Sequence, residues 1–213
     1  MPLQNRVTPF GEIVAIPERG TMFGNRGGRF HDPRTLSLTK RRFASRRWIC
    51  CELTFKGRHR KVFGPGYTEL FFLDEATALA AGHRPCFECR YADAIRFRKA
   101  FGHGNHWRHP PRADEMDILL HDERRSPRAV VENWQDLPDG VMIAQGDKAC
   151  LVLSGELFAW TATGYHANHE VEAGKVHLLT PPSIVAALSA GYRVRFHSSV
   201  LALRNSIQGE RRS

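Results

Sequence analysis

The sequence predicts a mixed α+β protein, with a treble-clef-like core of zinc knuckle, β-hairpin and helix followed by a β-rich C-terminal part. Three patterns lead to this fold class. A Cys-x-x-Cys motif at Cys86 and Cys89 precedes a helical pattern, apolar residues alternate in 48–55, and short strand-like runs joined by glycine turns follow residue 140. With 213 residues, of which 42% are hydrophobic, the chain can bury an ordinary core.

A hairpin is predicted upstream of the Cys-x-x-Cys motif. Alternation in residues 48–55 places Cys51 on the same face as Leu53 and Phe55, and Cys50 on the opposite face. The turn falls at Lys56-Gly57-Arg58, and residues 59–63 form the returning strand. The metal-binding motif therefore follows a hairpin that carries two further thiols.

The stretch between the hairpin and the motif predicts a strand and a short capped helix. Residues 67–73 have the apolar character of a strand. Asp74 is a favourable N-cap for a helix over 75–81, because its side chain can accept from the first free backbone N–H groups. Gly82 then ends the helix, since glycine readily takes the left-handed conformation.

Two longer helices are predicted after the motif, over residues 89–101 and 112–125, because apolar side chains recur there at helical spacing. The turn Leu137-Pro138-Asp139-Gly140 marks a boundary. It divides the chain into a zinc-binding α+β domain, 1–137, with basic N-terminal loops, and a β-rich subdomain, 138–213.

The C-terminal part predicts a set of short strands and one helix. Gly-containing turns separate the runs at Gly146 and Gly155. A helix is expected to start in Thr180-Pro181-Pro182-Ser183 and to run through Ala190, with Pro181 near its first turn and Gly191 as its stop. The predicted strands cover residues 141–143, 149–153, 156–161, 175–179 and 192–196, and a short basic tail ends the chain.

The charge of the chain favours a polyanionic partner. The sequence has 31 Lys and Arg against 22 Asp and Glu, a net charge of +9, and Arg outnumbers Lys. Arg pairs with phosphate through two hydrogen bonds, and its binding releases counterions from nucleic acid. A basic, soluble surface would have the same composition. The residues expected to hold phosphate are Arg26, Arg29, Arg41, Arg42, Arg46, Arg47, Arg96 and Lys99.

The spacing of Cys86 and Cys89 lets two thiolates face one tetrahedral metal ion, for which zinc is the expected identity. A structural zinc site takes four ligands, and the other upstream thiols are Cys50 and Cys51. Because strand neighbours point to opposite faces, we expect Cys51 to bind, with Cys50 as the alternative. The fourth ligand is His59, His31 or water, and water would make the site catalytic.

Residues 72–90, FLDEATALAAGHRPCFECR, resemble the Ada-type zinc domain of bacterial alkylation-repair proteins. That domain is a small DNA-binding module with four cysteine ligands, one of which accepts a methyl group from a DNA phosphotriester. The resemblance implies that Cys86 and Cys89 bind zinc and that the Gly-His-Arg-Pro turn shapes the knuckle. It also implies that Cys50 or Cys51 stands where the first ligand pair belongs.

These features predict a zinc-binding, nucleic-acid-binding protein of DNA repair or processing, with DNA favoured over RNA. One alternative is a metal-dependent enzyme acting on nucleic acid, with His31 and Asp32 as candidate catalytic residues in a polar, glycine-rich loop. Another is a protein-interaction module in which zinc only stabilises the core. A run of apolar residues long enough for a membrane span and a signal-peptide pattern are not found, so we expect a cytoplasmic protein.

Overall fold

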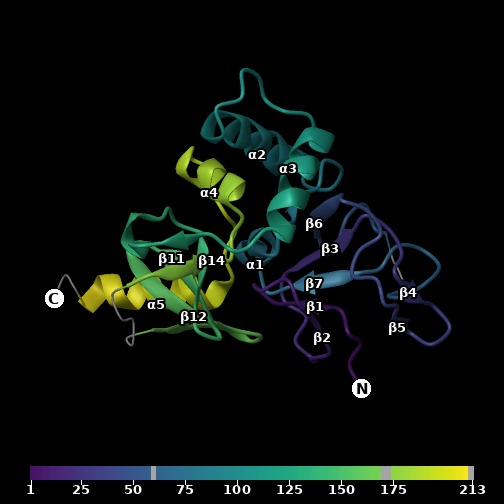
Figure 1. Ribbon diagram of the computed structural model, residues 1–213. Coiled ribbons are helices and arrows are strands. Elements are labelled where there is room, and N and C mark those ends of the chain that lie inside the picture. Colours follow the sequence, from purple (N-terminus) through teal and green to yellow (C-terminus); the bar gives the residue numbers. More distant parts are fainter. Residues whose placement is uncertain (59–60, 169–173, 211–213) are drawn as a thin grey trace.

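The computed structural model describes residues 1–58, 61–168 and 174–210, and within them the protein is a mixed α+β structure with five α-helices (Figure 1). One β-sheet comes from the N-terminal half of the chain and a second from the C-terminal half. Figure 1 shows the two sheets side by side, with helices above and between them. The predicted α+β class is thus confirmed at the level of mixed helices and sheets.

The N-terminal sheet has six strands within the described residues, all of them before residue 86. Across the sheet their order is β2-β1-β7-β3-β6-β8, and β3 pairs antiparallel with both β7 and β6. A separate hairpin joins β4 (His31–Asp32) and β5 (Ser37–Leu38). The six strands are β1 (Arg6–Val7), β2 (Ile13–Val14), β3 (Met22–Arg26), β6 (Trp48–Glu52), β7 (Leu70–Phe72) and β8 (Arg84–Pro85).

The C-terminal sheet is antiparallel, with the order β13-β12-β11-β10-β14-β9. Strands β10 to β13 form a meander in which each strand pairs with the next in the chain. The turns at Gly146 and Gly155 between the first three strands were predicted, whereas β13 was not. The β-rich C-terminal part is therefore confirmed. Its strands are β9 (Val130–Val131), β10 (Met142–Gln145), β11 (Lys148–Leu153), β12 (Glu156–Thr161), β13 (Gly164–Ala167) and β14 (Val176–Leu178).

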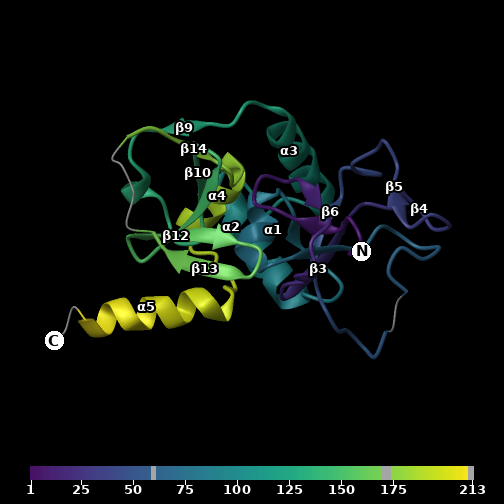
Figure 2. The ribbon, with the colours of Figure 1, turned by 90° about the horizontal axis from the view of Figure 1, so that it is seen from below.

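The helices are α1 (Glu75–Ala80), α2 (Tyr91–Gly104), α3 (Ala113–Arg125), α4 (Pro182–Ser189) and α5 (Ser198–Glu210), with a short 3-10 helix at Trp134–Asp136. Helix α5 runs along the outside of the C-terminal sheet and extends beyond it (Figure 2). Across the residues that the structure describes, none of these helices has the length and apolar character needed to cross a lipid bilayer.

Helix α1 lies between the two sheets, and its N-cap connects them (Figure 1). The buried carboxylate of Asp74 accepts from the backbone N–H of Thr77 at 2.9 Å, as an N-cap does. It also accepts from the Tyr165 hydroxyl on β13 at 3.0 Å and from the backbone N–H of His197 at 3.0 Å. The predicted cap is confirmed, and it also fixes the C-terminal part of the chain against α1.

The first residue of α1 makes a second connection. The side chain of Glu75 is fully buried and accepts from the Tyr192 hydroxyl at 2.6 Å and from the backbone N–H of Arg195 at 2.9 Å. The guanidinium of Arg90 lies 2.8 Å from the same carboxylate and is also fully buried. Because a buried carboxylate needs partners for its lone pairs, these three donors fix the segment around residue 195 beside the start of α2.

Two of the three apolar clusters contain residues from both sides of the predicted boundary at residue 137. One contains Phe97 and Leu120 together with Val152 and Ile184, and another contains Leu73 together with Phe158. The boundary itself stays a prediction. The two parts of the chain nevertheless share buried apolar surface, and this contributes the main stabilising free energy of folding.

Most predicted helices agree with the structure, whereas two predicted strands do not. Residues 192–196 are irregular, because the backbone N–H of Arg195 is used by Glu75 instead of a sheet partner. Residues 61–63, the described part of the predicted returning strand, are also irregular. Phe63 has φ +56° and its N–H donates to Glu69, which is incompatible with a strand at that point.

Several elements were not expected, and the largest of them are β3 and α5. The glycine-rich segment around Gly24 contains strand β3, because Gly24 lets the carbonyl of Ile49 come close: a Cβ there would lie 2.1 Å from that oxygen. The turn follows at Gly27 and Gly28, which both have positive φ. At the other end of the chain, the predicted basic tail contains α5.

The contact between α2 and α4 gives a stability prediction. A Cβ at Gly104 would lie 2.1 Å from the carbonyl oxygen of Ala186, an atom of the α4 backbone that cannot move independently. We expect Gly104→Ala to lower the free energy of unfolding by about 1–3 kcal/mol, because overpacking outweighs the better helix propensity of alanine. Urea denaturation of both proteins measures this change.

Gly66→Ala is the matched control. Its φ is not positive, and no atom lies within 4 Å of the position that a Cβ would take. Its free energy of unfolding should stay within about 0.5 kcal/mol of the original protein. Equal effects of the two substitutions would contradict the close approach of α2 and α4.

Candidate metal centre

Three cysteines, one from a strand of the N-terminal sheet and two from the turn that follows its edge strand β8, meet at one point. Cys51 lies on β6, and Cys86 and Cys89 lie on the turn between β8 and α2. Strand β8 runs parallel to β6, with Pro85 opposite Cys50, and the N–H of Cys86 donates to the carbonyl of Cys50 at 2.9 Å. This pairing fixes the start of the Cys-x-x-Cys turn beside Cys51.

The geometry of the three sulfur atoms fits a zinc ion. All three lie within 4.8 Å of one another. Sulfur atoms bound to one tetrahedral zinc, at about 2.3 Å each, lie about 3.8 Å apart. Backbone N–H groups already point at two of them: Glu88 donates to Cys86 Sγ at 3.3 Å and Glu52 donates to Cys89 Sγ at 3.4 Å. Such donors stabilise thiolates, so the site favours the ligand form of the cysteines.

The thiols also share their protons. Hydrogen bonds from Cys51 and Cys89 lower the pKa of Cys86, whereas the hydrogen bonds that Cys51 makes to Cys86 and Cys89 raise its own pKa. The three thiols thus form one hydrogen-bonded group in which Cys86 is the sulfur whose thiolate is favoured. A divalent cation would take the place of the shared protons.

Cys50 does not join the cluster. As strand geometry requires, it points to the opposite face of β6 from Cys51, and it is completely buried. Its sulfur lies 3.6 Å from the Arg90 guanidinium, and burial raises the pKa of its thiol. The sequence offered Cys51 and Cys50 as upstream ligands. The structure brings Cys51 to the cluster and buries Cys50 on the other side of β6.

His31 also lies away from the site. Both of its ring nitrogens are engaged, Nδ1 with Thr68 Oγ1 at 2.8 Å and Nε2 with the carbonyl of Gly64 at 2.9 Å, and the ring stacks on Phe63. His59 lies outside the described residues. Among those that are described, no fourth His, Cys, Asp or Glu joins the cluster. Three sulfur ligands leave one position of a tetrahedral ion open to another group.

A cavity of about 460 Å³ adjoins the three sulfurs, and all three cysteines line it. Its floor is one face of the N-terminal sheet. Cys51 is opposite Phe23, and Phe23 is opposite Phe71, so these side chains share a face. Residues two positions along, Asn25 and Ile49, form the next row on that face. We call this cavity the thiol pocket.

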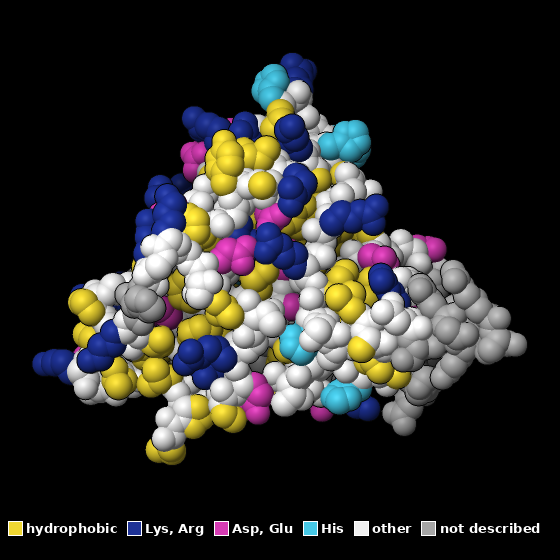
Figure 3. All heavy atoms as spheres, turned by 180° about the vertical axis from the view of Figure 1, so that it is seen from behind, with side chains coloured by type: hydrophobic (Ala, Val, Ile, Leu, Met, Phe, Trp, Pro, Cys, Tyr) yellow, Lys and Arg dark blue, Asp and Glu magenta, His cyan; other side chains and the backbone are white. Residues whose placement is uncertain are grey.

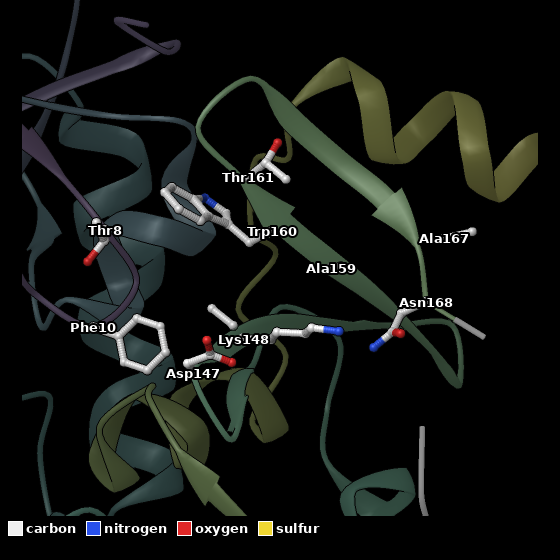
Figure 4. Close-up of a pocket in the computed structure, with 10 residues that line it drawn as sticks. Thr8, Phe10, Asp147, Lys148, Ala159, Trp160, Thr161, Ala167 and Asn168 are labelled. Atoms are coloured by element: carbon white, nitrogen blue, oxygen red, sulfur yellow. The ribbon is translucent and has the colours of Figure 1, made fainter. Parts of the chain in front are cut away.

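The thiol pocket is distinct from a wider hollow between the N-terminal turn and the C-terminal sheet. There, Phe10 and Trp160 face a common space, while Lys148 extends toward Asn168 (Figure 4). That hollow measures about 690 Å³. Its walls carry no cluster of metal-binding side chains among the described residues, so it offers no comparable chemistry.

The candidate catalytic residues His31 and Asp32 form no catalytic pair. His31 is 3% exposed and fully hydrogen-bonded, as described above. Asp32 faces outward on the β4–β5 hairpin and accepts from the backbone N–H of Arg34 at 2.9 Å, which lowers the pKa of its carboxyl. Their contacts are those of a stabilised turn.

Seven of the eight predicted phosphate-binding residues are exposed, and Arg26 is not. The guanidinium of Arg26 stacks on Trp48 with 3.9 Å to the ring centroid, and Arg124 lies 4.2 Å from the centroid of the same ring. Arg26 is 2% exposed, and burial together with the charges of Arg124 and Arg42 lowers its pKa to about 9. It stays charged at neutral pH, but inside the protein.

The exposed cations belong to two groups. Arg29, Arg41, Arg42, Arg46 and Arg47 lie on the connections around β4 and β5. Arg96 and Lys99 lie on α2 and share a hollow of about 330 Å³ with Arg193, which follows α4. On the face seen in Figure 3, Lys and Arg side chains spread over the upper region, where Figure 1 places α2, α3 and α4.

Sequence reasoning missed residues on both sides of the N-terminal sheet. It gave Arg90 no role and treated Asp74 and Glu75 only as the start of a helix, so it did not predict the buried ion pair between Arg90 and Glu75. Glu69, just before β7, and Asn25 on β3 line the pocket. An acidic residue at the start of an otherwise apolar strand was the one local signal for Glu69.

The metal centre predicts a contrast between neighbouring cysteines. Zinc content of the purified protein should be about one equivalent per chain, and Cys51→Ser, Cys86→Ser and Cys89→Ser should each bring it below about half. Cys50→Ser is the control, since Cys50 is adjacent in sequence but outside the cluster, and should keep its zinc. Elemental analysis measures all four. Loss of zinc from Cys50→Ser alone would contradict the arrangement.

His83 gives a pH prediction. It is completely buried between Trp48 and Phe72, and burial and the charges of Arg26 and Arg124 hold its pKa well below the ordinary 6.5. Unfolding therefore takes up a proton below pH 6.5, so acidification destabilises the folded state. Between pH 6.5 and 5.5, the free energy of unfolding should fall by about 1 kcal/mol more than in His83→Gln.

Urea denaturation of both proteins across that pH range measures the difference. The other histidines are common to both, so their contributions cancel. Parallel pH profiles would mean that His83 gains its proton equally well in the folded state.

The comparisons with known proteins add no further identification. The resemblance of residues 72–90 to the Ada-type zinc domain rests on the motif alone and stays a prediction. No family model, curated protein or solved structure matches this chain.

Proposed function

We propose that this chain is a zinc-binding protein that binds nucleic acid, with DNA as the favoured partner. One observation supports metal binding: the three cysteine sulfur atoms lie within 4.8 Å of one another. The pairing of β6 with β8 holds the segments that carry them together. The Cys86–Cys89 turn leads directly into α2 and faces a ligand on a strand. This arrangement supports a treble-clef-like core of the Ada type.

The nucleic-acid part rests on charge and exposure. Phosphate binding requires cations that reach the surface, and seven of the eight predicted residues do so. Arg41, Arg46 and Arg47 have exposed side chains on one connection of the N-terminal sheet. A net charge of +9 adds a long-range attraction for a polyanion.

A metal-dependent enzyme acting on nucleic acid is the second candidate, and the thiol pocket favours it. A closed structural zinc site has four protein ligands, whereas three cysteines line this cavity. Zinc held in this way supplies Lewis-acid chemistry to a bound group. The protein residues around it, Glu52, Glu69 and Asn25, would orient that group through hydrogen bonds.

The nucleic-acid function predicts salt-dependent binding. Fluorescence anisotropy with labelled single- and double-stranded DNA and RNA should show affinity falling steeply between about 50 and 200 mM salt. The double variant Arg46→Ala and Arg47→Ala should bind more weakly. It should also reduce the slope of log affinity against log salt by about one for each phosphate that the protein no longer neutralises.

Arg34→Ala is the matched control. Arg34 is exposed on the β4–β5 hairpin but already pairs with Asp32 at 3.4 Å, so its removal should change the slope little. Absence of binding at low salt to all four nucleic acids would rule out the proposal. Binding that ignores salt would rule out phosphate contacts as its basis.

A further inference from the structure

Glu69 is a buried acidic side chain with too few partners. It is 4% exposed, and one carboxylate oxygen, Oε2, accepts from the backbone N–H of Phe63 at 2.8 Å. Glu69 has no ion pair within the described part of the chain. Its other oxygen, Oε1, accepts no hydrogen bond from a described residue and is not shut off from solvent. It therefore reaches the thiol pocket that Glu69 lines. A buried carboxylate in this state favours a ligand that donates hydrogen bonds.

Asn25 lies beside Glu69 on the same sheet face. Gly24 on β3 is opposite Leu70 on β7, so the antiparallel register places Asn25 across from Glu69. The Asn25 side-chain oxygen accepts from the N–H of Gly27 at 2.9 Å, which orients the Nδ2 group as the remaining donor. Among the described residues Oε1 of Glu69 is free, and Oε2 keeps a second lone pair beyond the one that the Phe63 N–H uses, so the pair offers a ligand two acceptor sites next to one amide donor.

The walls of the thiol pocket determine the shape of that ligand. They are mostly apolar, with Phe23, Ile49 and Phe71 among them, and the volume of about 460 Å³ suits a small organic molecule. The guanidinium of Arg19 covers Phe71 at 5.0 Å and that of Arg58 covers Phe55 at 5.4 Å. Arg58 is paired with Glu88 at 2.6 Å, so Arg19 is the cation of this wall that can pair with an anionic group of a ligand.

We propose that the thiol pocket binds the guanine base of a nucleotide unit, with Glu69 and Asn25 reading its Watson–Crick edge. Guanine presents two adjacent N–H donors and one carbonyl acceptor, which match the carboxylate and the amide N–H in order. Adenine and cytosine place an acceptor nitrogen against the carboxylate, and thymine has one donor. Arg19 also lines the pocket, and we assign it to a phosphate of the same nucleotide. This inference rests on the proposed nucleic-acid function.

The first experiment varies the ligand and leaves the zinc-loaded protein unchanged. Calorimetry compares guanosine, inosine and adenosine monophosphates, and anisotropy compares oligothymidines with one central guanine, hypoxanthine or adenine. Hypoxanthine lacks only the exocyclic amino group of guanine. Guanine should bind about tenfold more tightly than hypoxanthine, because hypoxanthine has one donor fewer for Glu69, and adenine should bind more weakly still. The two arms separate a free nucleotide from a base within a strand.

The second experiment varies the protein. Glu69→Gln keeps an acceptor for the Phe63 N–H but replaces one carboxylate oxygen by an amide donor, so the preference for guanine over hypoxanthine should disappear. Glu88→Gln is the control. Glu88 lines the same cavity but is exposed and pairs with Arg58 at 2.6 Å, so the preference should persist. Circular dichroism and zinc content verify that both variants fold.

Equal affinity for guanine, hypoxanthine and adenine in both arms overturns the inference, even if Glu69→Gln fails to fold. A guanine preference that survives in a folded Glu69→Gln protein overturns it as well. If oligonucleotides bind with salt dependence but without base preference, the inference fails while the proposed function stands. If no nucleic acid binds, the proposed function fails, and a preference for guanosine monophosphate alone would still support the pocket assignment.

Discussion

The buried guanidinium of Arg90 is the interaction on which the rest of the structure depends. It lies 2.8 Å from Glu75 and 2.8 Å from Asp93, with its side chain fully inaccessible to water, and its Nη1 approaches the Cys50 sulfur at 3.6 Å. Burial alone would lower its pKa, but the charge of Glu75 and other neighbours outweighs this effect and raises it. Removing one partner of such a pair leaves an uncompensated buried charge, at a cost of about 3–5 kcal/mol. One side chain thus couples the cysteine turn, α1 and the underside of β6.

This ion pair explains how a short turn can present its two sulfurs to that of Cys51 in a fixed arrangement. Cys89 and Arg90 are adjacent, so their side chains leave the chain in different directions: the thiol toward Cys51, the guanidinium toward Glu75. Cys50 and Cys51 divide in the same way across β6. The ion pairs of Arg90 lie on one side of the N-terminal sheet, and the thiol pocket lies on the other. In each adjacent pair, Cys50 with Cys51 and Cys89 with Arg90, one side chain points to each side. Arg195 extends the ionic layer to Glu52 at 2.7 Å, at the rim of the pocket.

The sequence was informative where the cause of a structure is local. Asp74 as a cap, Gly82 as a stop, the helix after Cys89 and the meander with turns at Gly146 and Gly155 all depend on a few adjacent residues, and all are observed. Alternation along 48–52 also separated Cys51 from Cys50 correctly.

The predictions that failed depend on contacts between residues that are far apart in the sequence. Arg26 looked like a surface cation because its partner Trp48 is distant in sequence, and residues 192–196 looked like a strand because Glu75, which takes the N–H of Arg195, lies 120 residues earlier. Glu69 and Asn25 meet only through the register of β3 and β7.

The long sequence separations at α1 have a consequence for synthesis of the chain. The contacts of Asp74 and Glu75 with Tyr192, Arg195 and His197 span 117 to 123 residues. During translation, the three cysteines leave the ribosome long before the segment that completes the shell around α1, so the cysteine cluster is synthesised while Glu75 still lacks two of its donors. Contacts of this length slow folding, because a large loop must close before they contribute. The acidic start of α1 is therefore exposed to water in the growing chain and becomes buried only when almost the whole protein has been made.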